Sequence, residues 1–121
     1  MELRYLVDTS VLIEPSAEPL DAVSPLATSV VCLGELHGGV LAARTPDERT
    51  ARLDVLAIAA ALVVLDVDRQ VASAYGRIRA ASGRGPANDL WIAATAVAMG
   101  LTLVTRDRKL AALPGLRSLV V

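Results

Sequence analysis

The chain has 121 residues, which is enough for one domain of ordinary size and too few for two. Apolar residues make up 54% and charged residues 21%, so the composition excludes intrinsic disorder and supplies one packed core. Lysine and arginine total 12 against 13 aspartates and glutamates, which excludes a strongly basic nucleic-acid-binding arm and an acidic tail. We therefore expect a single domain over residues 1–121, in which any contact with a polyanion comes from a local arrangement of charge.

The sequence also carries indications of the compartment. Cys32 is the single cysteine, so it cannot form an internal disulfide, and a lone thiol suits a reducing environment. The longest uninterrupted apolar run, Val55–Leu65, is well short of the roughly 20 residues that span a bilayer. The N-terminus lacks the basic region and cleavage site of a signal peptide. We expect a cytoplasmic protein without a membrane partner.

Short apolar stretches recur along the chain and are predicted to be strands. They are Leu3–Val7, Ser29–Leu33, Leu62–Leu65, Leu101–Val104 and Leu116–Val121. Most are continuous apolar runs without alternation, which is typical of strands buried on both faces of a parallel sheet.

Helices are predicted between these strands. The expected helices are Ser10–Glu14, Glu35–Ala43, one from the Thr45 cap to about Ala61, Arg69–Ala81, and Asp89–Met99. The third has a clear start, because Thr45 can act as the N-cap, proline follows, and Glu48 can complete a capping box. The alternation of strands and helices predicts an α/β fold with a parallel sheet and helices on both faces.

Four acidic residues are predicted to gather at one edge of that sheet. Asp8 directly follows the first strand, and Asp107 follows the fourth strand closely. Glu35 opens the helix after the second strand, and Asp89 opens the last long helix. In open parallel sheets, ligand sites lie beyond the carboxyl ends of the strands. Clustered carboxylates repel one another unless divalent cations are bound, and ligand sets made only of oxygen favour Mg²⁺ or Mn²⁺. Such a cluster suits metal-assisted hydrolysis of phosphodiesters.

Each of these residues also has a purely structural interpretation. Asp8 could cap a short helix, Asp89 could complement the dipole of a first helical turn, and Asp107 could be an ordinary turn aspartate. Glu35 interrupts an apolar segment, so a charge at that position requires a partner or a function.

At these four positions the sequence resembles the PIN-domain ribonucleases, and more narrowly the VapC-type toxins of bacterial toxin–antitoxin pairs. Tyr5–Leu12 resembles the opening strand of the family with its first aspartate and hydroxyl partner. Ser29–Leu36 resembles the segment that ends in the family's glutamate, and Gly39 fits what usually follows. Asn88–Ala94 and Leu103–Asp107 resemble the third and fourth motifs, so the likeness covers essentially the whole chain.

The resemblance implies a PIN-like three-layer α/β/α fold with a central five-stranded parallel sheet. It implies that Asp8, Glu35, Asp89 and Asp107 form the catalytic metal site of a Mg²⁺- or Mn²⁺-dependent endoribonuclease. It also implies a toxin that forms a homodimer, cleaves RNA and is inhibited by a cognate VapB-type antitoxin. Groups that could orient the carboxylates or contact the substrate are Thr9, Ser10, Asn88, Thr105 and Arg106.

The chain departs from the family pattern in its aromatic residues. Leu110 stands where relatives often carry an aromatic side chain, and the chain has no phenylalanine. Platforms on which RNA bases could stack are therefore scarce.

Basic side chains at Arg106, Arg108 and Lys109 are expected on the rim of the site.

Other classes of function remain open from the sequence. A receiver-like signalling domain would use Asp66 after the third strand, but Thr9 stands where such a domain needs a second acid. A phosphatase of the haloacid dehalogenase type needs an acid at the position of Ser10. The third alternative is a PIN-like fold that only binds and does not catalyse.

Overall fold

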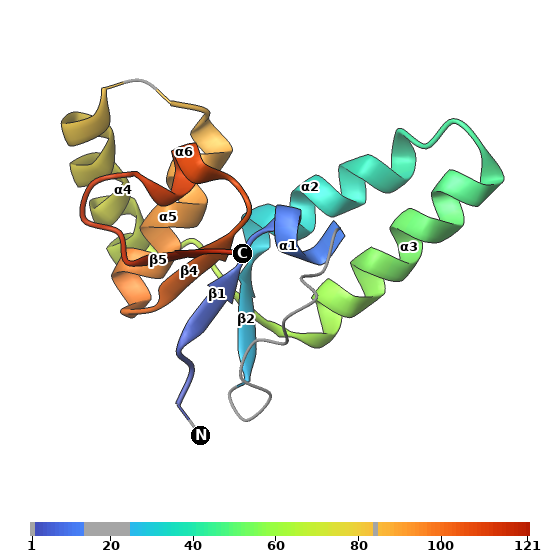
Figure 1. Ribbon diagram of the computed structural model, residues 1–121, viewed down its shortest axis with the longest axis horizontal. Helices are drawn as coiled ribbons and strands as arrows, with labels where there is room; N and C mark the ends of the chain where they lie inside the picture. The colour runs from blue at the N-terminus through green and yellow to red at the C-terminus, as the bar shows by residue number, and fades with distance from the viewer. Residues whose placement is uncertain (1, 14–24, 84) are drawn as a thin grey trace.

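The computed structural model describes residues 2–13, 25–83 and 85–121, which form a parallel sheet with helices on both sides (Figure 1). In chain order the elements are β1 (Tyr5–Val7), α1 (Thr9–Ile13), β2 (Leu26–Ser29), α2 (Val30–Leu41), α3 (Pro46–Ala61), β3 (Val63–Leu65), α4 (Arg69–Ser82), α5 (Ala87–Met99), β4 (Thr102–Thr105), α6 (Arg108–Ala111) and β5 (Ser118–Val120). The α/β fold class and the five-stranded parallel sheet are confirmed.

The strand order is β3-β2-β1-β4-β5, so the chain winds outward in both directions from the central pair β1 and β4. Val7 pairs with Val104, and the Asp8 N–H donates to the Val104 carbonyl just beyond the last pair. Ligands of open α/β sheets bind where the winding direction changes, beyond the carboxyl ends of the strands. In this sheet, that position is the end of β1 and β4.

Alternation along the central strands divides the core between the two faces of the sheet. Leu6 and Leu103 pack with α4 and α5 on one face. Their neighbours Val7 and Val104 pack with α1 and α3 on the other face. Successive residues of a strand point to opposite sides, so both faces of β1 and β4 are buried, as the unbroken apolar runs predicted.

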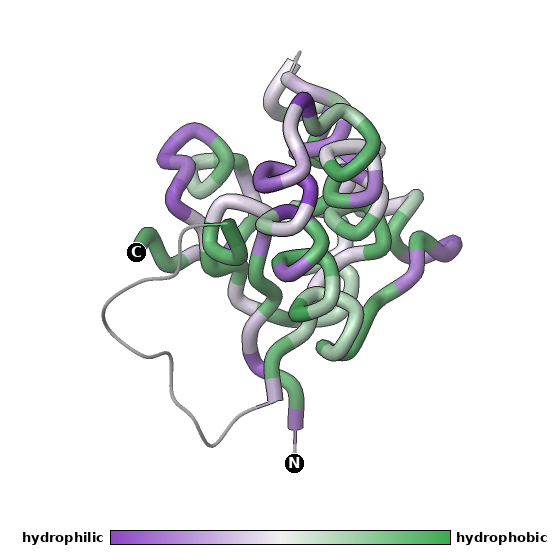
Figure 2. Tube along the Cα trace, turned by 90° about the vertical axis from the view of Figure 1, so that its right-hand side faces the viewer, coloured by the Kyte–Doolittle hydropathy of each residue, from purple (hydrophilic) through white to green (hydrophobic). Residues whose placement is uncertain are grey.

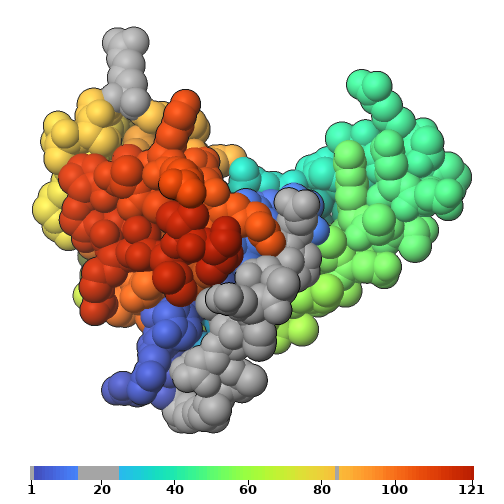
Figure 3. Space-filling view, in the orientation of Figure 1, coloured from blue at the N-terminus to red at the C-terminus, as the bar shows by residue number. Residues whose placement is uncertain are grey.

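Helix α2 lies across the carboxyl edge of the sheet and joins the two parts of the core. Cys32 is buried with the cluster on the α4–α5 face, whereas Leu36, one turn later, is buried with the cluster on the α1–α3 face. Beyond this point α2 and α3 extend away from the sheet as an arm, which we call the α2–α3 arm (Figure 1). Figure 3 shows a hollow between this arm and the part of the molecule that carries α5 and α6.

The second predicted strand is wrong. The structure has a strand at Leu26–Ser29 and starts a helix at Val30, where the sequence predicted strand Ser29–Leu33. Ser29 ends the strand because its side chain accepts a hydrogen bond from the Val31 N–H and caps α2. Short apolar runs do not distinguish a strand from a buried helix, and the β-branched residues at the start of α2 favour a strand in the sequence alone.

Other boundaries moved by a few residues. Helix α1 begins one residue before the predicted start, and the predicted end at Glu14 lies outside the described residues. The predicted start of α3 is confirmed, with Thr45 Oγ1 accepting from the Glu48 N–H at 3.1 Å. Helix α5 begins at Ala87 and ends, as predicted, at Gly100, whose φ of 68° suits glycine. Within the described residues, no helix is long and apolar enough to cross a membrane.

Candidate metal centre

Asp8 is the best-anchored carboxylate at the sheet edge, and it is only 5% exposed. Ser10 Oγ donates to Asp8 Oδ1 at 2.6 Å, and Thr105 Oγ1 donates to Asp8 Oδ2 at 2.8 Å. We call these two residues the hydroxyl clamp. Each carboxylate oxygen therefore receives one of these hydrogen bonds. The orientation of the carboxylate is set by Ser10 on α1, just after β1, and by Thr105 at the end of β4.

Backbone groups determine which way the hydroxyl clamp donates. The Arg106 N–H donates to Ser10 Oγ at 3.0 Å, and the Asp107 N–H donates to Thr105 Oγ1 at 3.0 Å. Each hydroxyl oxygen thus accepts from the backbone and donates its proton to Asp8, whose ionised carboxylate can only accept. The clamp therefore ties Asp8 to the turn that carries Asp107.

Asp107 combines a structural and a potential ligand role. It is the N-cap of α6, and its Oδ1 accepts from the Lys109 and Leu110 N–H groups at 2.9 and 3.3 Å. The structural interpretation of Asp107 as a turn aspartate becomes more specific here, because the residue is a helix cap. Both capping bonds use Oδ1, however, so capping leaves Oδ2 without a role in the cap.

The sequence did not predict α6, because the helix is too short to show a periodic pattern. Asp107, a favoured N-cap residue, was the one signal of its start.

Glu35 lies in the second turn of α2 and does not open the helix, in contrast to the prediction. Its side chain is exposed, and Oε1 accepts from Thr9 Oγ1 at 3.0 Å. The apolar neighbours that made this charge conspicuous, such as Leu36, occupy the buried face of the helix. Thr9 is therefore the partner that the charge was expected to need.

Asp89 is the third residue of α5 and is half-buried. Burial, followed by the negative charges of Asp107, Glu35 and Asp8, raises the pKa of its carboxyl. The positive end of a helix dipole acts in the opposite direction, so the like charges and the burial outweigh it. The structure thus brings all four predicted carboxylates within electrostatic reach of one another.

The weaker candidates are distributed around these carboxylates. Thr9 binds Glu35, Ser10 and Thr105 bind Asp8, and the half-buried Arg106 reaches the site through its backbone. Asn88 is exposed next to Asp89 on the first turn of α5.

The donor set fits a hard divalent cation, because the four converging side chains offer only carboxylate oxygens. Cys32 is fully buried, and His37 is exposed on α2 without a second histidine in the chain. Among the described residues, no three potential ligands already stand in an arrangement that could hold an ion. Asp8 is held by the hydroxyl clamp and Asp107 by its capping bonds, whereas Glu35 has one printed side-chain hydrogen bond, to Thr9.

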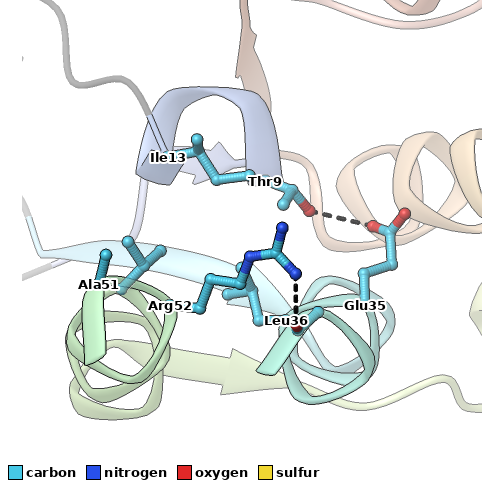
Figure 4. Close-up of a pocket in the computed structure, with 8 residues that line it drawn as sticks. Thr9, Ile13, Glu35, Leu36, Ala51 and Arg52 are labelled. Atoms are coloured by element: carbon cyan, nitrogen blue, oxygen red, sulfur yellow. Dashed lines mark hydrogen bonds between the residues drawn. The ribbon is translucent and has the colours of Figure 1, made fainter. Parts of the chain in front are cut away.

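A pocket of about 460 Å³ adjoins the carboxylates on the side of the α2–α3 arm (Figure 4). Its lining comes from α1, α2 and α3 and comprises Thr9, Ile13, Glu35, Leu36, Gly39, Ala51, Arg52 and Val55. Arg52 donates from Nη1 to the Gly39 carbonyl at 2.6 Å. The sequence did not single out Arg52, because nothing along the chain shows that α3 folds back beside Glu35.

Comparisons with known proteins identify the family of the chain. The family model described as the PIN domain matches residues 5–116. The chain is 40% identical to Ribonuclease VapC4 of Mycobacterium tuberculosis over 126 residues, covering 98% of this chain and 97% of that protein. It is 44% identical to Ribonuclease VapC5 of the same organism over 124 residues, covering 96% and 92%. The crystal structure of VapBC-5 from M. tuberculosis, a member of the VapBC family of toxin–antitoxin systems, matches with a TM-score of 0.83 and 40% identity, covering 99% of this chain and all of that one. The chain therefore belongs to the PIN-domain family, as a member of the VapC type.

Proposed function

We propose that this chain is the toxin of a type II toxin–antitoxin pair and acts as a metal-dependent endoribonuclease on RNA phosphodiester bonds. The family and the names of the two ribonuclease relatives support the activity. The observation that carries the proposal for the site is the clamped Asp8 at the ends of β1 and β4. The negative charges of Asp107, Glu35 and Asp8 all contribute to the raised pKa of Asp89, which supports one shared site.

The four carboxylates differ in what they contribute. Asp8 provides a fixed oxygen pair, because the hydroxyl clamp holds both of its oxygens from the protein side. Asp107 keeps Oδ2 for a ligand while Oδ1 caps α6. Asp89 ionises less readily than an ordinary aspartate, so it binds a cation with loss of a proton over a higher pH range.

We propose Mg²⁺ or Mn²⁺ as the cofactor, held by Asp8, Glu35, Asp89 and Asp107. When bound, such ions activate a water molecule for attack and stabilise the leaving oxygen of a phosphodiester. Carboxylates alone select hard cations over zinc, which prefers nitrogen and sulfur ligands. Thr9 orients Glu35 toward this centre, and Ser10 and Thr105 orient Asp8. Asn88 and Arg106 are placed to contact the substrate or a carboxylate from the rim.

We further propose that the chain works as a single PIN domain over residues 1–121, in the cytoplasm, with a VapB-type antitoxin as its inhibitor. Structures of VapBC complexes from relatives support the antitoxin partner. A homodimer is supported by apolar side chains exposed on α3, which include Leu53 and Ile58. Figure 2 looks onto the α2–α3 arm and shows apolar and hydrophilic segments side by side there. Sedimentation at micromolar concentration should show a dimer, and a monomer alone would contradict this assignment.

The test is RNA cleavage by purified protein with Mg²⁺, followed by sequencing of the new RNA ends. Asp8→Asn should lower the cleavage rate at least about 100-fold, and excess EDTA should abolish cleavage. Asp66→Asn is the matched control, because Asp66 also directly follows a strand but is exposed after the edge strand β3. Cleavage that survives Asp8→Asn or EDTA would contradict the proposal.

The same control separates the alternatives. A receiver-like domain would depend on Asp66, so loss of function in Asp66→Asn with normal Asp8→Asn protein would favour that class. A fold that only binds would neither cut RNA nor bind Mn²⁺ in calorimetry.

A further inference from the structure

The pocket beside the metal centre shares two of its residues with that centre. Thr9 and Glu35 are hydrogen-bonded to each other and form its wall on the carboxylate side (Figure 4). Ile13 on α1 and Val55 on α3 supply apolar walls, and Ile13 is 61% exposed. The volume, about 460 Å³, falls within the range of sites that bind small organic groups.

Arg52 provides the positive charge of the pocket and is hydrogen-bonded across it. Figure 4 shows its side chain reaching from α3 across the pocket toward α2. Its Nη1 donates at 2.6 Å to the Gly39 carbonyl in the last turn of α2, where carbonyls have few helical partners. This bond restricts the plane of the guanidinium, so a flat ligand stacked on Arg52 would immobilise little additional side chain.

We propose that this pocket binds the base of the RNA nucleotide next to the scissile phosphate, with the base stacked on the Arg52 guanidinium. The inference rests on the four-carboxylate site proposed above, because that site determines where the scissile phosphate lies. A phosphate at Glu35 places the neighbouring nucleotide at the mouth of the pocket, since Glu35 lines both. Ile13 and Val55 then contact the apolar faces and edges of the base.

Two observations favour a base over an apolar side chain of a protein. First, a guanidinium attracts both the polyanion and the π face of a base, whereas it adds nothing for an aliphatic group. Second, the aromatic rings that usually stack RNA bases are engaged elsewhere. Tyr75 and Trp91 stack on each other at 3.9 Å and pack against the core, Tyr5 on β1 packs against the second core cluster, and the chain has no phenylalanine. Arg52 is therefore the stacking group that adjoins the carboxylates.

The test uses a short RNA that spans a cleavage site mapped by sequencing. Each of the two nucleotides on either side of the cut is replaced in turn by an abasic ribose. Wild-type protein should lose affinity at one of these positions, with KM for cleavage and Kd by fluorescence anisotropy both rising about tenfold or more. The kcat should change little, because stacking acts equally on the bound substrate and the transition state.

Three variants determine whether Arg52 is responsible. In Arg52→Ala, KM and Kd for the intact RNA should rise similarly, and the additional effect of the abasic position should fall below about twofold. Arg52→Lys keeps the charge but loses the flat stacking surface, so it should behave like Arg52→Ala. Arg49→Ala removes the same charge one turn earlier on α3, outside the pocket, and should behave like the wild type.

The outcomes are distinct. An abasic effect of equal size in wild type and Arg52→Ala at every position would overturn the proposal, as would wild-type behaviour of Arg52→Lys. Weaker antitoxin binding by Arg52→Ala with unchanged RNA kinetics would also overturn it and assign the pocket to the protein partner. If the wild type cleaves no RNA, the proposed function fails and this proposal fails with it. If the wild type cleaves RNA but the abasic and Arg52 effects are absent, this proposal alone fails.

Discussion

Replacing Thr105 by valine removes one hydroxyl and nearly nothing else, so it isolates the hydroxyl clamp. Thr105 is fully buried, and its Oγ1 both donates to Asp8 and accepts from the Asp107 N–H. Valine has a similar shape but leaves a buried carboxylate oxygen without a donor. Leaving such a group unpaired costs about 1–3 kcal/mol, and hydrogen bonds to charged groups lie at the upper end. The Asp107 N–H, which loses its acceptor in the variant, adds little to this free-energy cost, because Asp107 is exposed and water can take the place of the hydroxyl.

We therefore expect Thr105→Val to lower the free energy of unfolding by about 2–3 kcal/mol in metal-free urea denaturation. Thr95→Val is the matched control, since Thr95 is equally buried but its hydroxyl donates only to the Trp91 carbonyl of its own helix. That carbonyl keeps its helical partner, so the control should lose less than about 1 kcal/mol. Calorimetry should also show Mn²⁺ binding about 10–100-fold weaker in Thr105→Val alone. Equal stability of the two variants, together with unchanged Mn²⁺ affinity, would refute the role assigned to the clamp.

Three further predictions concern the charges and the thiol. The raised pKa of Asp89 means that its contribution to stability, present at low pH, is lost as the pH rises through its folded-state pKa. Asp89→Asn should consequently stabilise the metal-free protein at pH 7 by a few tenths of a kcal/mol and have no effect below about pH 3. A loss of stability at pH 7, measured by urea denaturation, would contradict this expectation. Saturating Mg²⁺, at about 100 times its Kd, should raise the unfolding free energy of wild type by about 2.7 kcal/mol but that of Asp8→Asn far less, and equal shifts would count against Asp8 as a ligand. Burial raises the pKa of the Cys32 thiol, so a chromogenic disulfide reagent should label the native protein at least about 100-fold more slowly than the unfolded chain, whereas rapid labelling would disagree with the packing of α2.

The sequence predicted the position of the carboxylates better than the elements that carry them. Asp8 follows β1 directly and Asp107 is the second residue after β4. Parallel strands bring their ends to one edge, so two of the four positions follow from topology alone. Glu35 lies at the predicted edge of the sheet, but it does not open a helix as the sequence predicted. It lies five residues into α2, and that helix crosses the edge of the sheet and brings Glu35 to Thr9.

The errors have local causes. Strand β2 contains Thr28 and Ser29, which are fully buried although hydroxyl residues are usually taken as loop or cap signals. Thr28 is accommodated because its hydroxyl donates to the Val7 carbonyl at 2.9 Å. Periodicity carries no information on such a contact between residues far apart in the chain. The same holds for Arg52, whose place beside the carboxylates results from the packing of α3 on α2.

A structural role of an acidic residue does not exclude the metal-ligand role proposed for it. Asp107 caps α6 with one oxygen, and the capping bonds orient the whole carboxylate. The cap uses only Oδ1, so it leaves Oδ2 for the ligand role proposed for this residue. A carboxylate has two oxygens, so it can cap a helix with one and offer the other to a ligand. The two roles are therefore not exclusive alternatives.

The most direct test of the metal centre is a crystal structure of the wild-type protein with Mn²⁺, in which anomalous scattering locates the ion. We predict an anomalous peak within roughly 2.1 Å of an Asp8 oxygen, with Glu35, Asp89 or Asp107 completing the ligands directly or through water. Ser10 and Thr105 should remain hydrogen-bonded to Asp8 in that structure. A peak elsewhere, or no peak at Asp8 at a Mn²⁺ concentration that supports RNA cleavage, would contradict the central claim.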